Sequence, residues 1–267
     1  MDFLLYCSTL AQVFYVVCIF GGASVGGLYL VRRLVSLDRL RENHEIGGLT
    51  FGVVGAFYGL LLAFVIVAAW ERFDNAGQQT HQEAVALESL YKIGTAFSEP
   101  TRKQVMQTTW NYTTRVLQVE WPEMSRNDYH PQVVGAHLMW KAVLSCQPSN
   151  NREQVLLDKA LEELDQISGA RSLRIAYYRE SLPSVMWLVI YLGCAITVGF
   201  SYFFGHRAFS SQAVMCATLA ILLGISILAV IELSHPYQGN VTVSDEPFRY
   251  ALSRMSEINL YQNPPHR

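Results

Sequence analysis

The sequence predicts an all-α integral membrane protein, with four transmembrane helices and a helical soluble bundle inserted between spans two and three. Two features of the composition point this way: 51% of the 267 residues are hydrophobic, and only 16% are charged. The excess of apolar residues is concentrated in four segments without a charged residue or histidine, each long enough to cross a bilayer core that needs about 20 helical residues. These segments cover residues 9–31, 49–70, 184–204 and 213–231.

The first apolar segment differs from a signal peptide in two ways. No basic residues precede it, and it is longer than the usual hydrophobic region of such a peptide. We therefore expect it to remain in the mature protein as the first span. Residues 1–70 then hold spans one and two with a short arginine-rich loop, and residues 183–234 hold spans three and four.

The polar segment 71–182 has the periodicity of a helical soluble domain. Small and apolar residues recur at steps of three and four after the second span, so that its helix is expected to continue beyond the membrane surface. A second helix starts after Ser98 and Pro100, and Trp121 with Pro122 is expected to end it. A helix from Arg152 to about Ser181 returns toward the third span, and 235–267 forms a short polar tail.

The orientation in the membrane stays open. Four spans place both termini and the polar domain on one side. Arg32, Arg33, Arg39 and Arg41 in the first short loop favour a cytoplasmic position for the short loops. Further arginines near the membrane ends on the other side weaken this preference.

The second span has two distinct faces. One face carries small residues that let another helix approach closely, and we expect it to pack within the chain, with an interface between copies as the alternative. The other face is bulky, and it contacts lipid or forms a hydrophobic constriction that lines a pore. The small face comprises Gly48, Gly52, Gly55, Gly59 and Ala63, and the bulky face comprises Val54, Phe57, Leu61, Phe64 and Ala68.

Glu71 and Glu232 each follow directly after an apolar span. Because spans two and four run in the same direction, both acids are expected at the same membrane face, where they need hydration or a partner. Arg72, or an arginine of the returning helix such as Arg171 or Arg174, could form an interfacial ion pair with them. The alternative is a ring of Glu71 side chains from several copies at a pore mouth, which would favour cations or calcium.

The sequence contains no enzyme signature. It lacks an HExxH motif, a phosphate-binding loop, a GxSxG motif and a dinucleotide loop, and its five cysteines have no metal-binding spacing. It also lacks the basic footprint of a nucleic-acid-binding protein. We expect neither catalysis nor a cofactor; calcium remains an option that no motif supports.

Several separated segments, taken together, resemble the family of mainly bacterial membrane proteins named DUF4239 and also called bestrophin-like. The resemblance covers residues from about 45 to 255. The segments are "GAFYGLLLAFVIVAAWERFDNA" with "EAVALESLYKIG", "RSLRIAYYRESLPSVMW", and "ELSHPYQGNVTVSDEPFRYAL".

The resemblance implies a link to bestrophins, which are pentameric anion channels with four spans per subunit and a helical cytoplasmic region. Their pore is lined by the second span, so Phe57, Leu61 and Phe64 would form the neck here. We expect a homo-oligomeric, multi-pass channel for small anions in the plasma membrane, the bacterial inner membrane. The alternatives are a non-conducting scaffold or sensor whose bundle binds a partner, and a cation pathway that uses Glu71 and Glu232.

Overall fold

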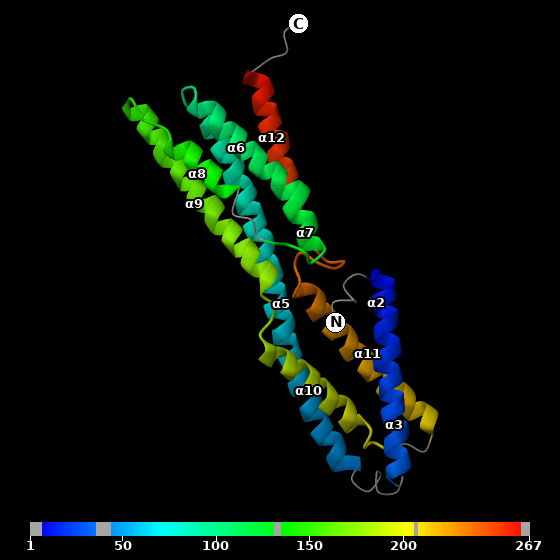
Figure 1. Ribbon diagram of the computed structural model, residues 1–267. Helices are drawn as coiled ribbons and strands as arrows, with labels where there is room; N and C mark the ends of the chain where they lie inside the picture. The colour runs from blue at the N-terminus through cyan, green and yellow to red at the C-terminus, as the bar shows by residue number, and fades with distance from the viewer. Residues whose placement is uncertain (1–6, 36–43, 131–134, 206–207, 263–267) are drawn as a thin grey trace. The chain divides into compact units, whose positions relative to one another are not determined.

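The computed structural model describes residues 7–35, 44–130, 135–205 and 208–262 (Figure 1). These residues form helices joined by turns and loops and include no strand, which confirms the all-α prediction. The chain divides into two compact units. The membrane unit comprises Met1–Arg72, Ser181–His235 and Gly239–Val241, and the helical unit comprises Phe73–Glu180, Pro236–Gln238 and Thr242–Arg267.

Four helical segments of the described residues are long and apolar enough to cross a membrane, which confirms the predicted number of spans. The first consists of α2 (Thr9–Val16), a π-helical turn η1 (Val17–Gly21) and α3 (Gly22–Leu34). The second is the first part of α5 (His44–Gly94), a helix of 51 residues. The third and fourth are α10 (Ser184–Ser201) and α11 (Phe209–Leu233).

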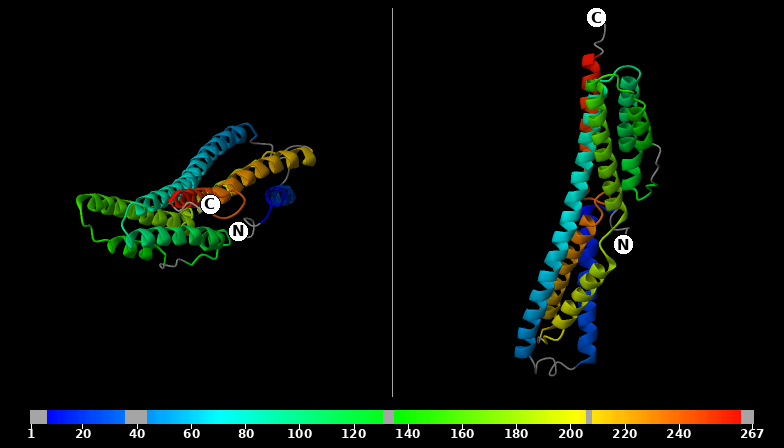
Figure 2. Two further views of the ribbon diagram at one scale, coloured as in Figure 1. Left: turned by 90° about the horizontal axis from the view of Figure 1, so that it is seen from above. Right: turned by 90° about the vertical axis from the view of Figure 1, so that its left-hand side faces the viewer.

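Helix α11 is the centre of the membrane unit. It packs against α2, η1 and α3 on one side and against α10 on another (Figure 2). In its most apolar stretch 44% of the residues are buried, whereas the corresponding stretch of α5 is only 17% buried. The second span is therefore the one that most needs cover from lipid or from another chain.

Glycines allow close contacts between the spans of the membrane unit. Cβ atoms added at Gly27 and Gly224 would lie 2.7 Å from the Tyr202 hydroxyl and from the Phe20 ring, respectively. At Gly193 of α10 an added Cβ would overlap the ring of Tyr58, which is buried and donates a hydrogen bond of 2.8 Å to the carbonyl of Ile190. These sites require glycine because an aromatic ring occupies the space of a side chain.

Gly193→Ala is expected to destabilise the chain by about 1–3 kcal/mol, because the anchored Tyr58 ring must move to admit the methyl group. Gly169→Ala in α9 (Asn151–Arg179) is the matched control, since its Cβ would meet no described atom within 4 Å. That substitution should stabilise by about 0.5–1 kcal/mol. Thermal unfolding of the purified full chain measures the change in stability of both variants. Equal changes would show that position 193 tolerates a side chain and does not require glycine.

The helical unit is built on the second part of α5, whose buried residues include Ala84, Leu87 and Leu90. Around it lie α6 (Thr101–Arg115), a π-helical turn η2 (Val116–Glu120), α7 (Trp121–Ser125), α8 (Ala136–Leu144), α9 and α12 (Glu246–Gln262). Phe248 and Met255 of α12 are fully buried in the same core, so the last helix of the chain is part of this unit.

The expected helix end at Trp121 and Pro122 is wrong. The helix continues through η2 into α7 and stops only after Ser125. Pro122 lies in the first turn of α7, where the missing backbone N–H costs little. The π-helical turn just before it shifts the hydrogen-bond register, which explains why a proline is accepted inside a longer helical run.

Candidate functional site

The membrane part of α5 has one buried face and a broad exposed surface. Tyr58, Leu62, Val65 and Ala69 are buried in the apolar core of the membrane unit. The other side is exposed and, except at its end, carries no charge. Between residues 52 and 71 the exposed residues are Gly52, Val53, Ala56, Phe57, Gly59, Leu60, Ala63, Phe64, Val67, Trp70 and Glu71.

The predicted pore-lining residues fall into two groups. Phe57 and Phe64 are each 64% exposed, whereas Val54, Leu61 and Ala68 are half-buried. Val54, Phe57 and Leu61 also line an apolar groove of about 430 Å³, whose other wall is formed by Val189, Leu192 and Ile196 of α10. The two phenylalanines are thus the most accessible members of the predicted set.

Two exposed residues of α5 belong beside Phe57 and Phe64 but were not predicted. Leu60 is 55% exposed and Val67 is 52% exposed. Steps of three and four residues join Phe57, Leu60, Phe64, Val67 and Glu71 along one side of the helix. We call these five residues the exposed stripe. Steps of four and three residues from Glu71 toward the start of the helix would have predicted the exposed stripe from the sequence. Glu71 must face water, and residues at this spacing lie on the same side of the helix.

The expected packing of the glycine face within the chain is wrong for Gly52, Gly55 and Gly59. A Cβ added at any of these positions would meet no atom of the described residues within 4 Å. Ala63 is also exposed. Of the predicted glycines only Gly48 approaches another part of the chain, with its added Cβ 4.0 Å from the ring of Phe204, which follows α10. Because Gly52, Gly55 and Gly59 meet no described side chain, the interface between copies, the alternative for this face, becomes the prediction.

Glu232 at the end of α11 is buried and hydrogen-bonded. Its carboxylate accepts hydrogen bonds from the side-chain amide of Gln12 at 2.5 Å and from the backbone N–H groups of Asn240 and Val241 at 3.1 and 3.2 Å. Within the described residues neither Glu232 nor the exposed Glu71 forms an ion pair. The expected interfacial pair with an arginine of the returning helix is therefore not formed there.

Those arginines instead form a buried charge cluster inside the helical unit. Arg174 donates to Glu83 of α5 at 2.7 Å and to Glu120 of η2 at 3.1 Å. Arg171 binds both carboxylate oxygens of Glu120 at 2.9 Å. Two phenol groups complete the cluster: the Tyr112 hydroxyl donates to Glu83 at 2.6 Å, and Tyr129 accepts from Arg171 at 3.3 Å.

The charges of this cluster compensate each other in a dry environment. The side chains of Arg174 and Glu83 are fully buried, and that of Glu120 is 6% exposed. Burial alone lowers the pKa of the Arg174 guanidinium, but Glu83, Tyr112 and Glu120 together outweigh this effect and hold the pKa well above its usual value. Arg174 is therefore a permanent cation, which needs its two carboxylate partners to stay buried.

The tyrosines of the cluster act as hydrogen-bonding groups rather than as acids. Burial, reinforced by the Glu83 carboxylate, raises the pKa of Tyr112 well above its ordinary value. Burial and Glu120 raise the pKa of Tyr129 in the same way. Because neither phenol ionises near neutral pH, both serve as neutral hydrogen-bonding groups in the cluster that joins α5, η2 and α9.

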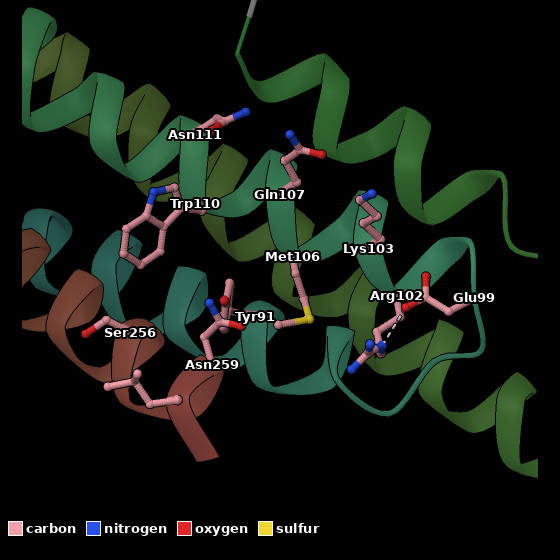
Figure 3. Close-up of a pocket in the computed structure, with 11 residues that line it drawn as sticks. Tyr91, Glu99, Arg102, Lys103, Met106, Gln107, Trp110, Asn111, Ser256 and Asn259 are labelled. Atoms are coloured by element: carbon pink, nitrogen blue, oxygen red, sulfur yellow. Dashed lines mark hydrogen bonds and ion pairs between the residues drawn. The ribbon is translucent and has the colours of Figure 1, made fainter. Parts of the chain in front are cut away.

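A cleft in the helical unit lies between α6 and α12 (Figure 3). Its volume is about 690 Å³, and it brings Lys103, Gln107 and Trp110 of α6 near Asn259 of α12. Glu99 and Arg102 form an ion pair of 2.9 Å at its rim. This mixture of charge, amide and aromatic groups selects no single class of ligand.

The described residues do not build a calcium or other metal site. Nowhere among them do three histidine, cysteine, aspartate or glutamate side chains come together so that they could hold a metal ion. Among these residues, Glu71 and Glu232 therefore belong to no group of acidic side chains that could serve calcium.

Comparisons with known proteins point to one family and one fold. The model of the bestrophin-like domain matches residues 18–248. A variant of a bacterial bestrophin homologue from Klebsiella pneumoniae aligns with a TM-score of 0.70 and 10% identity, covering 93% of this chain and 99% of that chain. A structure of such a homologue from the same organism, phased with zinc, aligns with a TM-score of 0.60 and 11% identity. The alignment covers 96% of this chain and 100% of that chain. No curated protein matches the sequence.

Proposed function

Because the chain belongs to the bestrophin-like family, we propose that it assembles into an oligomeric channel, which conducts small anions through a pore lined by α5. At the identities found, the similarity to the solved bacterial homologues establishes the fold alone. Membership of the narrower DUF4239 group and a place in the bacterial inner membrane belong to the same proposal.

The observation that carries the proposal is the exposed stripe on α5. A single chain with four spans has little room for its own aqueous path, so conduction requires several copies around an axis. If the stripes of those copies faced the axis, Phe57, Leu60, Phe64 and Val67 would form an apolar constriction, with Glu71 at its end. Such constrictions gate by excluding water.

The uncovered glycine face supports the same assembly. Gly52, Gly55, Gly59 and Ala63 lie beside the exposed stripe and permit close approach of a helix from a neighbouring copy. The two faces thus have separate roles, one toward the pore and one toward the neighbour.

A cation pathway is the second candidate, and the exposure of Glu71 is the observation in its favour. Glu232 contributes less than expected, because Gln12 and two backbone N–H groups already satisfy its buried carboxylate. In a cation channel Glu71→Gln would reduce cation selectivity and leave assembly intact. In an anion channel the same change would leave the preference for anions in place.

Ion flux into liposomes tests the proposal. Purified wild-type protein should admit chloride faster than potassium, and empty liposomes should admit neither. Absence of flux of either ion at every calcium concentration, pH and voltage applied would favour the third reading, a scaffold or sensor whose helical unit binds a partner.

A further inference from the structure

A basic pocket lies at one end of the membrane unit, where α3 ends and α11 begins. Its volume is about 520 Å³, and Tyr29, Arg32, Arg33 and Phe209 line it. The two arginines occupy the last turn of α3, directly after the apolar residues 9–31. A side chain at this place in a span lies at the level of the lipid headgroups.

The pocket is built from buried contacts. Gln212, only 3% exposed, accepts two hydrogen bonds from the Arg32 guanidinium, at 3.0 Å from Nε and 2.5 Å from Nη2. The amide of Gln212 in turn donates to the Tyr202 carbonyl at 3.2 Å, which fixes its orientation. The guanidinium carbon of Arg32 lies 5.4 Å from the centre of the Phe209 ring. Arg32 is thus held in place by a neutral amide and an aromatic face.

Arg33 supplies the accessible charge of the pocket. Its side chain is exposed, and it forms no hydrogen bond or ion pair with the residues that the structure describes. A guanidinium is suited to phosphate because its planar N–H groups match two phosphate oxygens. A fixed Arg32 beside an accessible Arg33 therefore offers a site for a phosphate group.

We propose that this pocket binds the phosphate of an anionic phospholipid. The neighbouring surface favours a lipid over free phosphate, because Tyr29, Leu30 and Leu34 are 56%, 58% and 83% exposed on the same helix. Acyl chains can cover this apolar surface while the headgroup meets the arginines, and basic pockets between spans bind acidic lipids in this way. The inference does not depend on the channel proposal, since an anchored scaffold would carry the same pocket.

Native mass spectrometry of the full chain, purified and stripped of lipid, tests the site. The chain is offered phosphatidylglycerol or phosphatidylcholine, and we expect it to retain the anionic lipid preferentially. Arg33→Gln should lower retention of phosphatidylglycerol about five-fold, the effect of one basic residue at a membrane surface. Arg152→Gln is the matched control, because it removes one exposed arginine from α9 of the helical unit and should change nothing.

Two further measurements make the assignment specific. Arg33→Lys keeps the positive charge but loses the planar N–H groups, so its retention of phosphatidylglycerol should lie between that of the wild type and that of Arg33→Gln. Retention by Arg33→Gln equal to that of the wild type would overturn the assignment. Inorganic phosphate added in excess should leave the bound phosphatidylglycerol in place, whereas its displacement would indicate a site for free phosphate. Equal retention of the two lipids by the wild-type chain would also overturn the proposal.

Discussion

Arg174→Met is expected to destabilise the helical unit by about 3–5 kcal/mol, because it leaves Glu83 and Glu120 as buried charges without their common partner. Arg171 still binds Glu120, but among the described residues Glu83 would keep only the hydrogen bond that the Tyr112 hydroxyl donates to it. Unfolding of the purified full chain by denaturant, followed by circular dichroism, measures the change. It should be the largest stability loss among single arginine substitutions in this unit.

Two variants separate the buried pair from a general effect of losing an arginine. Arg126→Met removes an exposed arginine at the end of α7 and should change stability by no more than about 0.5 kcal/mol. The double variant Arg174→Met with Glu83→Gln should lose less than the sum of the single losses, because it also removes the stranded carboxylate. A loss for Arg174→Met no larger than that for Arg126→Met would contradict the role assigned to the cluster.

Phe57→Ala and Phe64→Ala are expected to raise chloride flux severalfold, because each removes a large apolar side chain from the proposed constriction. The two phenylalanines are two helical turns apart on the exposed stripe, and neither is buried in its own chain. Their removal should therefore leave the fold of the single chain nearly unchanged. Chloride flux into liposomes, normalised to the amount of inserted protein, is the measurement.

Leu188→Ala in α10 is the control for the phenylalanine variants. Leu188 is 62% exposed and lies outside the exposed stripe, so its truncation removes apolar surface without touching the proposed path. Flux that rises equally in all three variants would point to a leak. Flux that stays at the wild-type level in both phenylalanine variants would remove α5 from the path.

The spans could be predicted from sequence because apolar length is a local property. Residues 49–70 alone require a membrane helix, and the periodic residues that follow require the same helix to continue, as α5 does. The glycine pattern was less informative. Small residues at steps of three and four permit close packing but do not say whether the partner belongs to the same chain. An added Cβ at Gly52, Gly55 or Gly59 meets no atom of the described residues within 4 Å.

The buried charge cluster could not be predicted for a different reason. Glu83, Glu120 and Arg174 are far apart in the sequence, and each resembles a surface residue of an amphipathic helix. Only the tertiary arrangement of α5, η2 and α9 brings them together. The sequence therefore offered Arg171 and Arg174 as partners for the acids at the membrane face, whereas they pair with Glu83 and Glu120 within the helical unit.

The oligomeric state tests the central claim most directly, because both the constriction and the glycine interface require several copies. Native mass spectrometry of the chain released from nanodiscs with bound lipid gives the number of subunits. The channel proposal predicts a single closed ring of identical chains, in which the α5 helices can surround an axis. A monomer or a simple dimer would contradict it, because neither can enclose a path with the exposed stripe.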